Sequence, residues 1–198
     1  MSSDDPQDPT GRLIVISGPS GSGKTTVLNQ LLVNCPLPLQ RSVSATTRDP
    51  RPDEKDGVHY YFLTHEQFQK KRESGEFLEC FEVFSSGQWY GTLHKEVTTS
   101  LGSGKWVVLE IDVQGAMEVL QRFPDTISFF VEPGSADELE RRLRGRGTES
   151  EQRIQSRLDR ARYEMAQADR YQYRIVNRDI DQSVTEICDI LNNHATGH

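Results

Sequence analysis

Residues 18–25 read GPSGSGKT and fit the pattern G-x-x-x-x-G-K-[ST]. An apolar run at residues 13–16 precedes them, and residues 27–32 continue as a helical pattern with one apolar face. The glycines let the backbone curl so that consecutive N–H groups point at phosphate oxygens, and a helix N-terminus adds partial positive charge. The motif therefore predicts a phosphate-binding P-loop in a strand–loop–helix unit. The alternative is a Gly/Ser-rich turn that binds nothing.

Two residues of this loop are predicted to act on a bound nucleoside triphosphate. Lys24 would reach the β- and γ-phosphates, and Thr25 would place its hydroxyl on Mg²⁺, the one cofactor that the sequence implies. The expected triphosphate contacts within the loop are Gly18, Pro19, Ser20, Gly21, Ser22, Gly23, Lys24, Thr25 and Thr26.

Net charge and cysteine content limit the kinds of binding partner and the cellular compartment that we expect. The 198 residues carry a net charge of −7, and nucleic acids and membrane surfaces demand a positive footprint, so neither is expected as a partner. Residues 1–10 hold three aspartates and no apolar run, which predicts a disordered acidic tail and no signal peptide. Three cysteines without metal-ligand spacing are expected to be buried or half-buried thiols, and they favour a reducing compartment, the cytoplasm.

Four apolar segments, at residues 13–16, 107–113, 127–131 and 173–176, are typical of buried strands and alternate with helical patterns. This alternation predicts a three-layer α/β fold with a mostly parallel central sheet. Helix starts are marked by capping patterns at Thr64, Ser135, Thr148 and Asp179, the last helix running to residue 191.

The segment before residue 107 has a different character. Short strands are expected at residues 59–63 and 77–84, on either side of a helix at 65–73, and residues 89–91 are expected to form a turn. Insertions of this polar, aromatic kind accumulate beyond the carboxyl ends of the strands in open α/β sheets, where ligands bind. We therefore expect this insertion to bind a ligand on the P-loop side of the sheet.

Further motifs follow at characteristic spacing: SVSATTRDPR at 42–51, WYGT at 89–92, IDVQG at 111–115 and RLRGRGTE at 142–149. Together with ISGPSG at 16–21, they resemble the guanylate kinase family over nearly everything from about residue 12 to residue 193. The resemblance implies a P-loop kinase with three parts. These are a core at 11–38, 96–136 and 163–198, a GMP-binding α+β insertion at 39–95, and a helical lid at 137–162.

The resemblance implies a GMP site in the insertion. The guanidinium forks of Arg48 and Arg51 suit a monophosphate dianion, although two such arginines can also be an exposed solubilising pair. A carboxylate at Glu79 can accept from guanine N1–H and the amino group together, whereas adenine offers a lone pair at N1. If the resemblance is set aside, Glu79 is expected to be a solvent-facing charge, and Tyr60 and Tyr90 are expected to be ordinary packing residues. The implied GMP contacts are Ser44, Arg48, Arg51, Tyr60, Glu79, Tyr90, Gly91, Thr92 and Asp112.

Two acidic residues, Glu110 and Asp112, end an apolar strand, where a charged side chain without an interaction partner is energetically costly. By resemblance, Asp112 belongs to the GMP site or, through water, to the Mg²⁺ shell. The alternative is a carboxylate satisfied by backbone amides. Glu110 replaces an aspartate of many relatives, which leaves its contact open.

Arginines are dense between residues 141 and 162. The resemblance selects Arg142, Arg146 and Arg157 as ligands of the ATP phosphates or of the transferring group, and it places Asn177 near the adenine or its ribose. The remaining arginines are expected to be solvated and paired with neighbouring acids; they are Arg141, Arg144, Arg153, Arg160 and Arg162.

The implied function is Mg-dependent transfer of the ATP γ-phosphoryl group to GMP, and to dGMP, in purine nucleotide metabolism. Lys24, Arg51, Arg146 and Arg157 are the implied catalytic residues. The acceptor is already an anionic oxygen, so no general base is required. Two alternatives stay open: an inactive guanylate-kinase-like module that binds peptides, and a kinase for another nucleoside monophosphate. No heptad or symmetric patch in the sequence indicates an oligomeric state.

Overall fold

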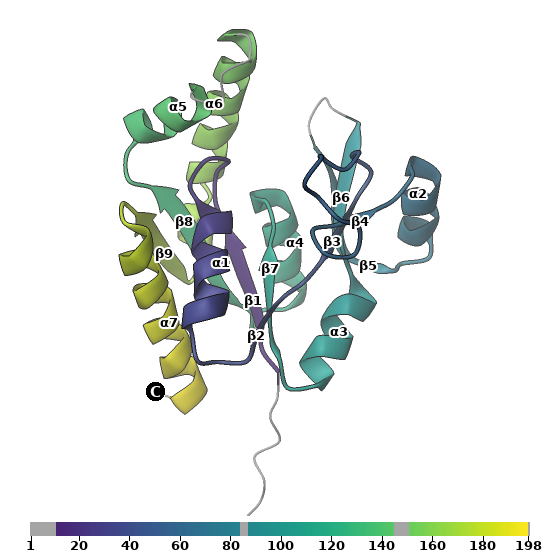
Figure 1. The fold of residues 1–198 in the computed structure, drawn as a ribbon, viewed down its shortest axis with the longest axis horizontal. Helices are drawn as coiled ribbons and strands as arrows, with labels where there is room; N and C mark the ends of the chain where they lie inside the picture. Colours follow the sequence, from purple (N-terminus) through teal and green to yellow (C-terminus); the bar gives the residue numbers. More distant parts are fainter. Residues whose placement is uncertain (1–10, 84–86, 145–150, 198) are drawn as a thin grey trace, which may run out of the picture.

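A five-stranded parallel sheet forms the core of the computed structural model, which describes residues 11–83, 87–144 and 151–197 (Figure 1). The strand order is β2-β7-β1-β8-β9, and every neighbouring pair is parallel. This arrangement confirms the predicted α/β fold. The strands are β1 (Leu13–Ser17), β2 (Leu39–Arg41), β7 (Trp106–Glu110), β8 (Ile127–Pro133) and β9 (Tyr173–Asn177).

Helices cover both faces of this sheet. On one face, α1 (Lys24–Asn34) and α7 (Ile180–Thr196) bury their apolar stripes against β1 side chains such as Ile14. On the other face, α4 (Val113–Arg122) and α3 (His94–Gly102) pack against Val15 and its neighbours. Strands buried on both faces are continuous apolar runs, which is why the sequence revealed β1, β7 and β8 but not the short, half-buried β2.

A second, four-stranded sheet forms the insertion, in the order β4-β3-β6-β5. Its helix α2 (His65–Glu73) has the bounds that the sequence predicts, because Thr64 and Gln67 form the expected capping box. Phe68 of this helix stacks on Phe77 with 4.4 Å between ring centroids. The strands are β3 (Ser44–Thr46), β4 (Tyr61–Phe62), β5 (Phe77–Val83) and β6 (Gln88–Leu93).

Two expectations about this region are wrong. Residues 89–91 do not turn but lie within β6, and Gly91 has no positive φ. A Cβ at Gly91 would lie 2.8 Å from Cys80 Cβ, so the glycine permits close strand approach rather than a turn. Residues 39–41, which we expected in the insertion, form β2 and pair with β7 of the central sheet.

The predicted strand at 107–113 is shorter than expected. It ends at Glu110, because the Asp112 side chain accepts from Gly115 N–H and caps α4. Asp179 caps α7 as predicted, and this helix continues to Thr196 rather than ending at residue 191.

Two helices, α5 (Ala136–Arg144) and α6 (Glu151–Met165), form an arm beyond the carboxyl ends of the central strands, on the side opposite the insertion (Figure 1). Leu139, Leu143 and Ala161 join the two helices in a small apolar cluster. Ser135 accepts from Glu138 N–H at the start of α5, as its capping pattern predicts. A short 3₁₀ helix, η1 (Ala168–Arg170), leads into β9.

Three sequence expectations fall outside the described residues: the acidic tail at 1–10, the capping pattern at Thr148, and Arg146. The cysteines are free thiols, with Cys35 buried and Cys80 and Cys188 half-buried, as expected. Among the helices of the described ranges, none combines the length and apolar character that crossing a membrane requires.

Candidate active site

The loop from Gly18 to Thr25 joins β1 to α1, which confirms the predicted strand–loop–helix setting. Gly18, Gly21 and Gly23 have φ values of 139°, 90° and 94°, which side chains rarely adopt. A Cβ at Gly18 would lie 2.2 Å from the carbonyl oxygen of Val131. Backbone conformation therefore favours glycine at all three positions, and close packing against backbone adds a second requirement at Gly18.

Lys24 lies folded against this loop. Its Nζ donates to the carbonyl oxygens of Gly18 at 2.6 Å and Pro19 at 2.9 Å. Burial lowers the pKa of Lys24, and the nearby carboxylates of Glu110 and Glu164 partly oppose that shift. The ammonium is thus held by weak neutral acceptors, which a phosphate dianion would outcompete.

The contact of Glu110 is now defined. Its carboxylate accepts from Thr25 Oγ1 at 2.5 Å and forms an ion pair with Arg41. Thr25 and Glu110, with Asp112 nearby on the same rim, offer hard oxygen atoms of the kind that Mg²⁺ prefers. Within residues 11–83, 87–144 and 151–197, no cluster of three or more His, Cys, Asp or Glu could hold a metal.

Residues expected to contact ATP surround the loop. Asn177 is buried beneath it and donates from Nδ2 to the carbonyl oxygen of Ser22 at 2.8 Å. From the arm, Arg142 donates to the carbonyl oxygen of Gly21 at 3.1 Å, and it also pairs with Glu138. Arg157 Nη2 reaches Ser20 Oγ at 3.2 Å. The tertiary structure therefore brings all three to the P-loop, from segments 121 to 155 residues away in the chain.

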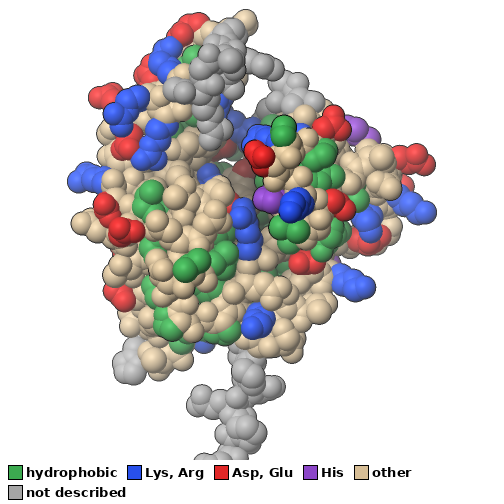
Figure 2. Space-filling model, viewed as in Figure 1, with side chains coloured by type: hydrophobic (Ala, Val, Ile, Leu, Met, Phe, Trp, Pro, Cys, Tyr) green, Lys and Arg blue, Asp and Glu red, His purple; other side chains and the backbone are tan. Residues whose placement is uncertain are grey.

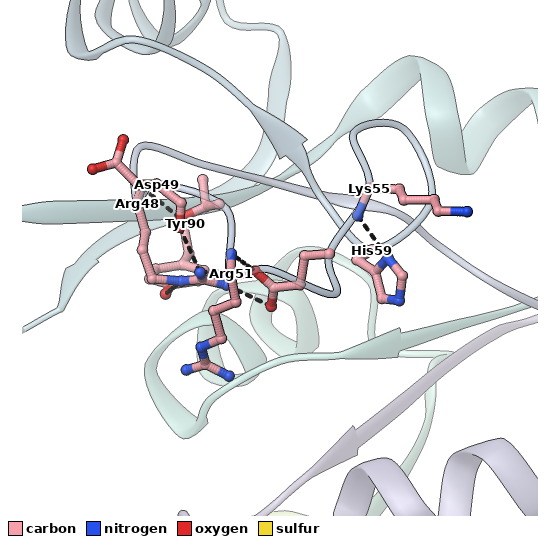
Figure 3. A network of polar contacts seen from close by, with 8 residues as sticks. Arg48, Asp49, Arg51, Lys55, His59 and Tyr90 are labelled. Atoms are coloured by element: carbon pink, nitrogen blue, oxygen red, sulfur yellow. Dashed lines mark hydrogen bonds and ion pairs between the residues drawn. The ribbon is translucent and has the colours of Figure 1, made fainter.

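Opposite the P-loop, Arg48 and Arg51 lie in a polar network (Figure 3). Glu54 accepts from both terminal nitrogens of Arg48, at 2.8 and 2.9 Å, and from the backbone N–H of Arg51 at 2.8 Å. Arg48 Nε donates to the hydroxyl of Tyr90 at 3.2 Å, and its guanidinium lies over the ring of Tyr60. The Arg48 guanidinium holds the pKa of Glu54 at about 2. Figure 3 shows the Arg51 side chain directed away from this network.

Glu79 is buried, not solvent-facing: it is 1% exposed on β5. Its Oε1 accepts from Thr92 Oγ1 at 2.6 Å, and Ser44 lies opposite Thr92 on the neighbouring strand. Burial raises the pKa of Glu79 to about 7, although the Thr92 hydrogen bond lowers it. Gly91 follows Tyr90 on β6 and also lines this part of the site.

Asp112 has more partners than the sequence indicated. Besides Gly115 N–H at 2.9 Å, its carboxylate accepts from Arg160 at 2.9 Å. Arg160 also pairs with Glu164, which is 5% exposed. The expected pairing of Arg160 with an acid of its own helix is present, but we did not expect Arg160 also to reach Asp112 and line the site. The sequence spacing could have indicated that Arg160 faces the site, because residues 157, 160 and 164 share one face of α6.

Most of these residues line one cleft of about 1790 Å³ between the arm and the insertion. Figure 2 shows this hollow from one side, with charged side chains gathered over α5 and α6. Of the expected site residues that the structure describes, Pro19, Ser22, Arg48 and Thr92 do not line it. The expected residues that line it are Gly18, Ser20, Gly21, Gly23, Lys24, Thr25, Thr26, Ser44, Arg51, Tyr60, Glu79, Tyr90, Gly91, Asp112, Arg142, Arg157 and Asn177.

A parallel sheet with a P-loop at its carboxyl edge, facing an arginine- and tyrosine-bearing pocket, defines the class of P-loop kinases. Residues 10–194 match the family described as guanylate kinase. The chain belongs to the guanylate kinase family.

Similar proteins align with nearly the whole chain. A guanylate kinase of Rhodopirellula baltica is 58% identical over 182 residues, covering 91% of this chain and 87% of that protein. One from Desulfitobacterium hafniense is 47% identical, covering 91% and 89%. The crystal structure of guanylate kinase from Anaplasma phagocytophilum superimposes with a TM-score of 0.76 at 34% identity, covering 94% of this chain and 87% of that one.

Proposed function

We infer that this chain is an ATP:GMP phosphotransferase, which moves the γ-phosphoryl group of ATP to GMP and releases ADP and GDP. One observation carries the inference most directly: the P-loop and the pocket of Arg51, Tyr90 and Glu79 face each other across a single cleft. We propose dGMP as a second acceptor, and purine nucleotide metabolism as the setting.

We propose that the donor ATP binds along the P-loop. Lys24 would leave the two carbonyl oxygens that it contacts and move to the β- and γ-phosphates. Arg142 and Arg157 already reach the loop from the arm, and Asn177 supports it from below, near the expected place of the adenosine. Thr25 would hold Mg²⁺, with Asp112 through water. The metal, when bound, neutralises phosphate charge.

For the acceptor, we propose that Arg51 grips the GMP phosphate with the hydroxyls of Tyr60 and Tyr90. Arg51 is exposed in the cleft, whereas the fork of Arg48 is occupied by Glu54. Arg48, paired with Glu54, would therefore act on the GMP phosphate chiefly by ordering Tyr90 through their hydrogen bond.

For the base, we propose that Glu79 and Ser44 recognise guanine. A buried carboxylate rewards a ligand that donates two hydrogen bonds, because its desolvation is then compensated. Adenine offers no such pair of donors on that edge. This preference disfavours a kinase for another nucleoside monophosphate.

The reaction then requires the two anionic substrates to be brought together in line. Lys24, Arg51, Arg146 and Arg157 are proposed to shield the repulsion and to stabilise the charge of the transition state. We propose that the arm at 137–162 and the insertion close over the substrates so that water is excluded from the phosphoryl group. The remaining described residues form the core, with 39–41 now included in it.

Steady-state assays with ATP against GMP, dGMP, AMP, CMP and UMP test this proposal. We expect turnover with GMP and dGMP, and rates lower by orders of magnitude with the other three. Equal turnover of AMP and GMP would exclude the guanine assignment. No turnover together with tight peptide binding would favour the inactive module, which the complete P-loop with Lys24 in the cleft argues against.

A further inference from the structure

Only one of the two carboxylate oxygens of Glu79 accepts a side-chain hydrogen bond from the residues that the structure describes. Its Oε1 accepts from Thr92 Oγ1 at 2.6 Å. Its Oε2 is buried, and among the residues that the structure describes no atom donates to it. An oxygen in this state is costly unless a ligand supplies the missing donor.

The surface beside Oε2 belongs to α4. Gly115 lies in the first turn of this helix, where its N–H donates to the capping carboxylate of Asp112 at 2.9 Å. A Cβ at Gly115 would lie 2.7 Å from Glu79 Oε2, 3.2 Å from Glu79 Cδ and 3.3 Å from a ring carbon of Phe81. A real Cβ does not approach an oxygen to 2.7 Å, so any side chain at position 115 displaces the carboxylate.

Backbone conformation does not explain this glycine. Gly115 has no positive φ, and it sits inside a helix, where alanine is favoured over glycine by about 1 kcal/mol. Position 115 therefore requires glycine because a side chain there would fill the space that the Glu79 carboxylate occupies.

We propose that Gly115 determines specificity for the purine base. Its missing side chain lets the Glu79 carboxylate lie where it can accept from two adjacent donors, the N1–H and the 2-amino group of guanine. This inference rests on the proposed function, in which Glu79 recognises the base. Gly115 acts through Glu79 and is a positioning residue.

Alanine at position 115 is expected to affect recognition more than folding. The atom that must yield is the end of a flexible side chain, which can rotate more easily than backbone can shift. Thr92 still holds one oxygen, so the carboxylate swings out of line rather than leaving the site. Recognition by two parallel hydrogen bonds depends on that alignment.

The experiment compares Gly115→Ala with native protein, using GMP and IMP as acceptors. IMP keeps N1–H but lacks the 2-amino group. Gly102→Ala is the matched control, because Gly102 also lies in a helix but a Cβ there would meet nothing within 4 Å. We expect the ratio of kcat/KM for GMP over IMP to fall by roughly tenfold or more in Gly115→Ala and to stay unchanged in Gly102→Ala. The KM for ATP and the melting temperature should change little.

A second pair of variants tests the steric cause. Glu79→Asp shortens the side chain by one methylene and removes the carboxylate from the position that the new Cβ occupies. Adding Gly115→Ala to Glu79→Asp should therefore change the GMP-to-IMP ratio much less than it does in the native background. If Gly115→Ala folds poorly, the steric cause instead predicts that adding Glu79→Asp raises its melting temperature toward that of Glu79→Asp alone.

An unchanged GMP-to-IMP ratio in Gly115→Ala would overturn the inference, as would equal losses on both acceptors. Equal effects of the alanine in the native and the Glu79→Asp backgrounds would overturn the steric cause. If the native chain does not phosphorylate GMP, the proposed function fails. If it does, and the ratio is insensitive to Gly115→Ala, only the inference about Gly115 fails.

Discussion

Replacing Glu79 by glutamine tests two proposed effects of the buried carboxylate separately: its effect on the free energy of unfolding and its effect on the use of GMP. Burial raises the pKa of Glu79 from 4.5 to about 7. Between these values the folded protein keeps a proton that the unfolded chain has lost. The free energy of unfolding that Glu79 contributes is therefore complete below pH 4.5 and is lost as pH rises to about 7.

The size of this loss follows from the shift. Each pKa unit corresponds to about 1.4 kcal/mol, so the free energy of unfolding should fall by about 2 to 3 kcal/mol between about pH 5 and pH 8 through this residue. Glutamine does not ionise and is nearly isosteric. The stability of Glu79→Gln relative to the native protein should rise by that amount over the same interval.

Urea unfolding at about pH 5 and about pH 8 measures this difference. Changes in packing or hydrogen bonding that do not depend on pH cancel when the two pH values are compared. Glu82→Gln is the control, because Glu82 lies on the same strand but is exposed. A stability difference between Glu79→Gln and the native protein that is independent of pH would refute the reasoning.

The same variant should lose function as it gains stability. An amide presents one acceptor and one donor to guanine, where the carboxylate presents two acceptors. We expect kcat/KM for GMP to fall about a hundredfold at about pH 8, with the KM for ATP unchanged. In the native enzyme, kcat/KM for GMP should decline below about pH 7 as Glu79 is protonated, and that part of the decline should be absent in Glu79→Gln.

Three further predictions concern the phosphate sites. Arg146→Ala should lower kcat about a hundredfold or more with a smaller effect on the KM for GMP, while Arg144→Ala serves as control; a near-normal kcat would remove Arg146 from the transition-state role. Glu54→Gln releases Arg48 from its ion pair and should raise the KM for GMP roughly tenfold with kcat within about twofold. A lowered KM would mean that Glu54 competes with the phosphate. Lys24→Met should lower kcat at least about a hundredfold, with GMP binding unchanged by calorimetry.

The sequence predicted most elements because local chemistry specifies them. Doubly buried strands are continuous apolar runs, and the capping box at Thr64 marks the start of α2 to the residue. The prediction failed at residues 89–91, where Gly91 was interpreted as a turn residue. A glycine that permits close packing between strands and one that permits a turn look alike until the neighbouring strand is known.

The sequence alone determined the P-loop and its place between a strand and a helix, because those features depend on residues next to one another in the chain. It also determined the family, since the motifs that carry the resemblance are short and contiguous. Only the tertiary structure decided that Glu79 is buried, that Glu54 occupies the fork of Arg48, and that Arg160 reaches Asp112. Burial and pairing depend on which segments the fold brings together. Glu79 and Gly115, far apart in the chain, meet only because β5 packs against α4, and no local pattern records that contact.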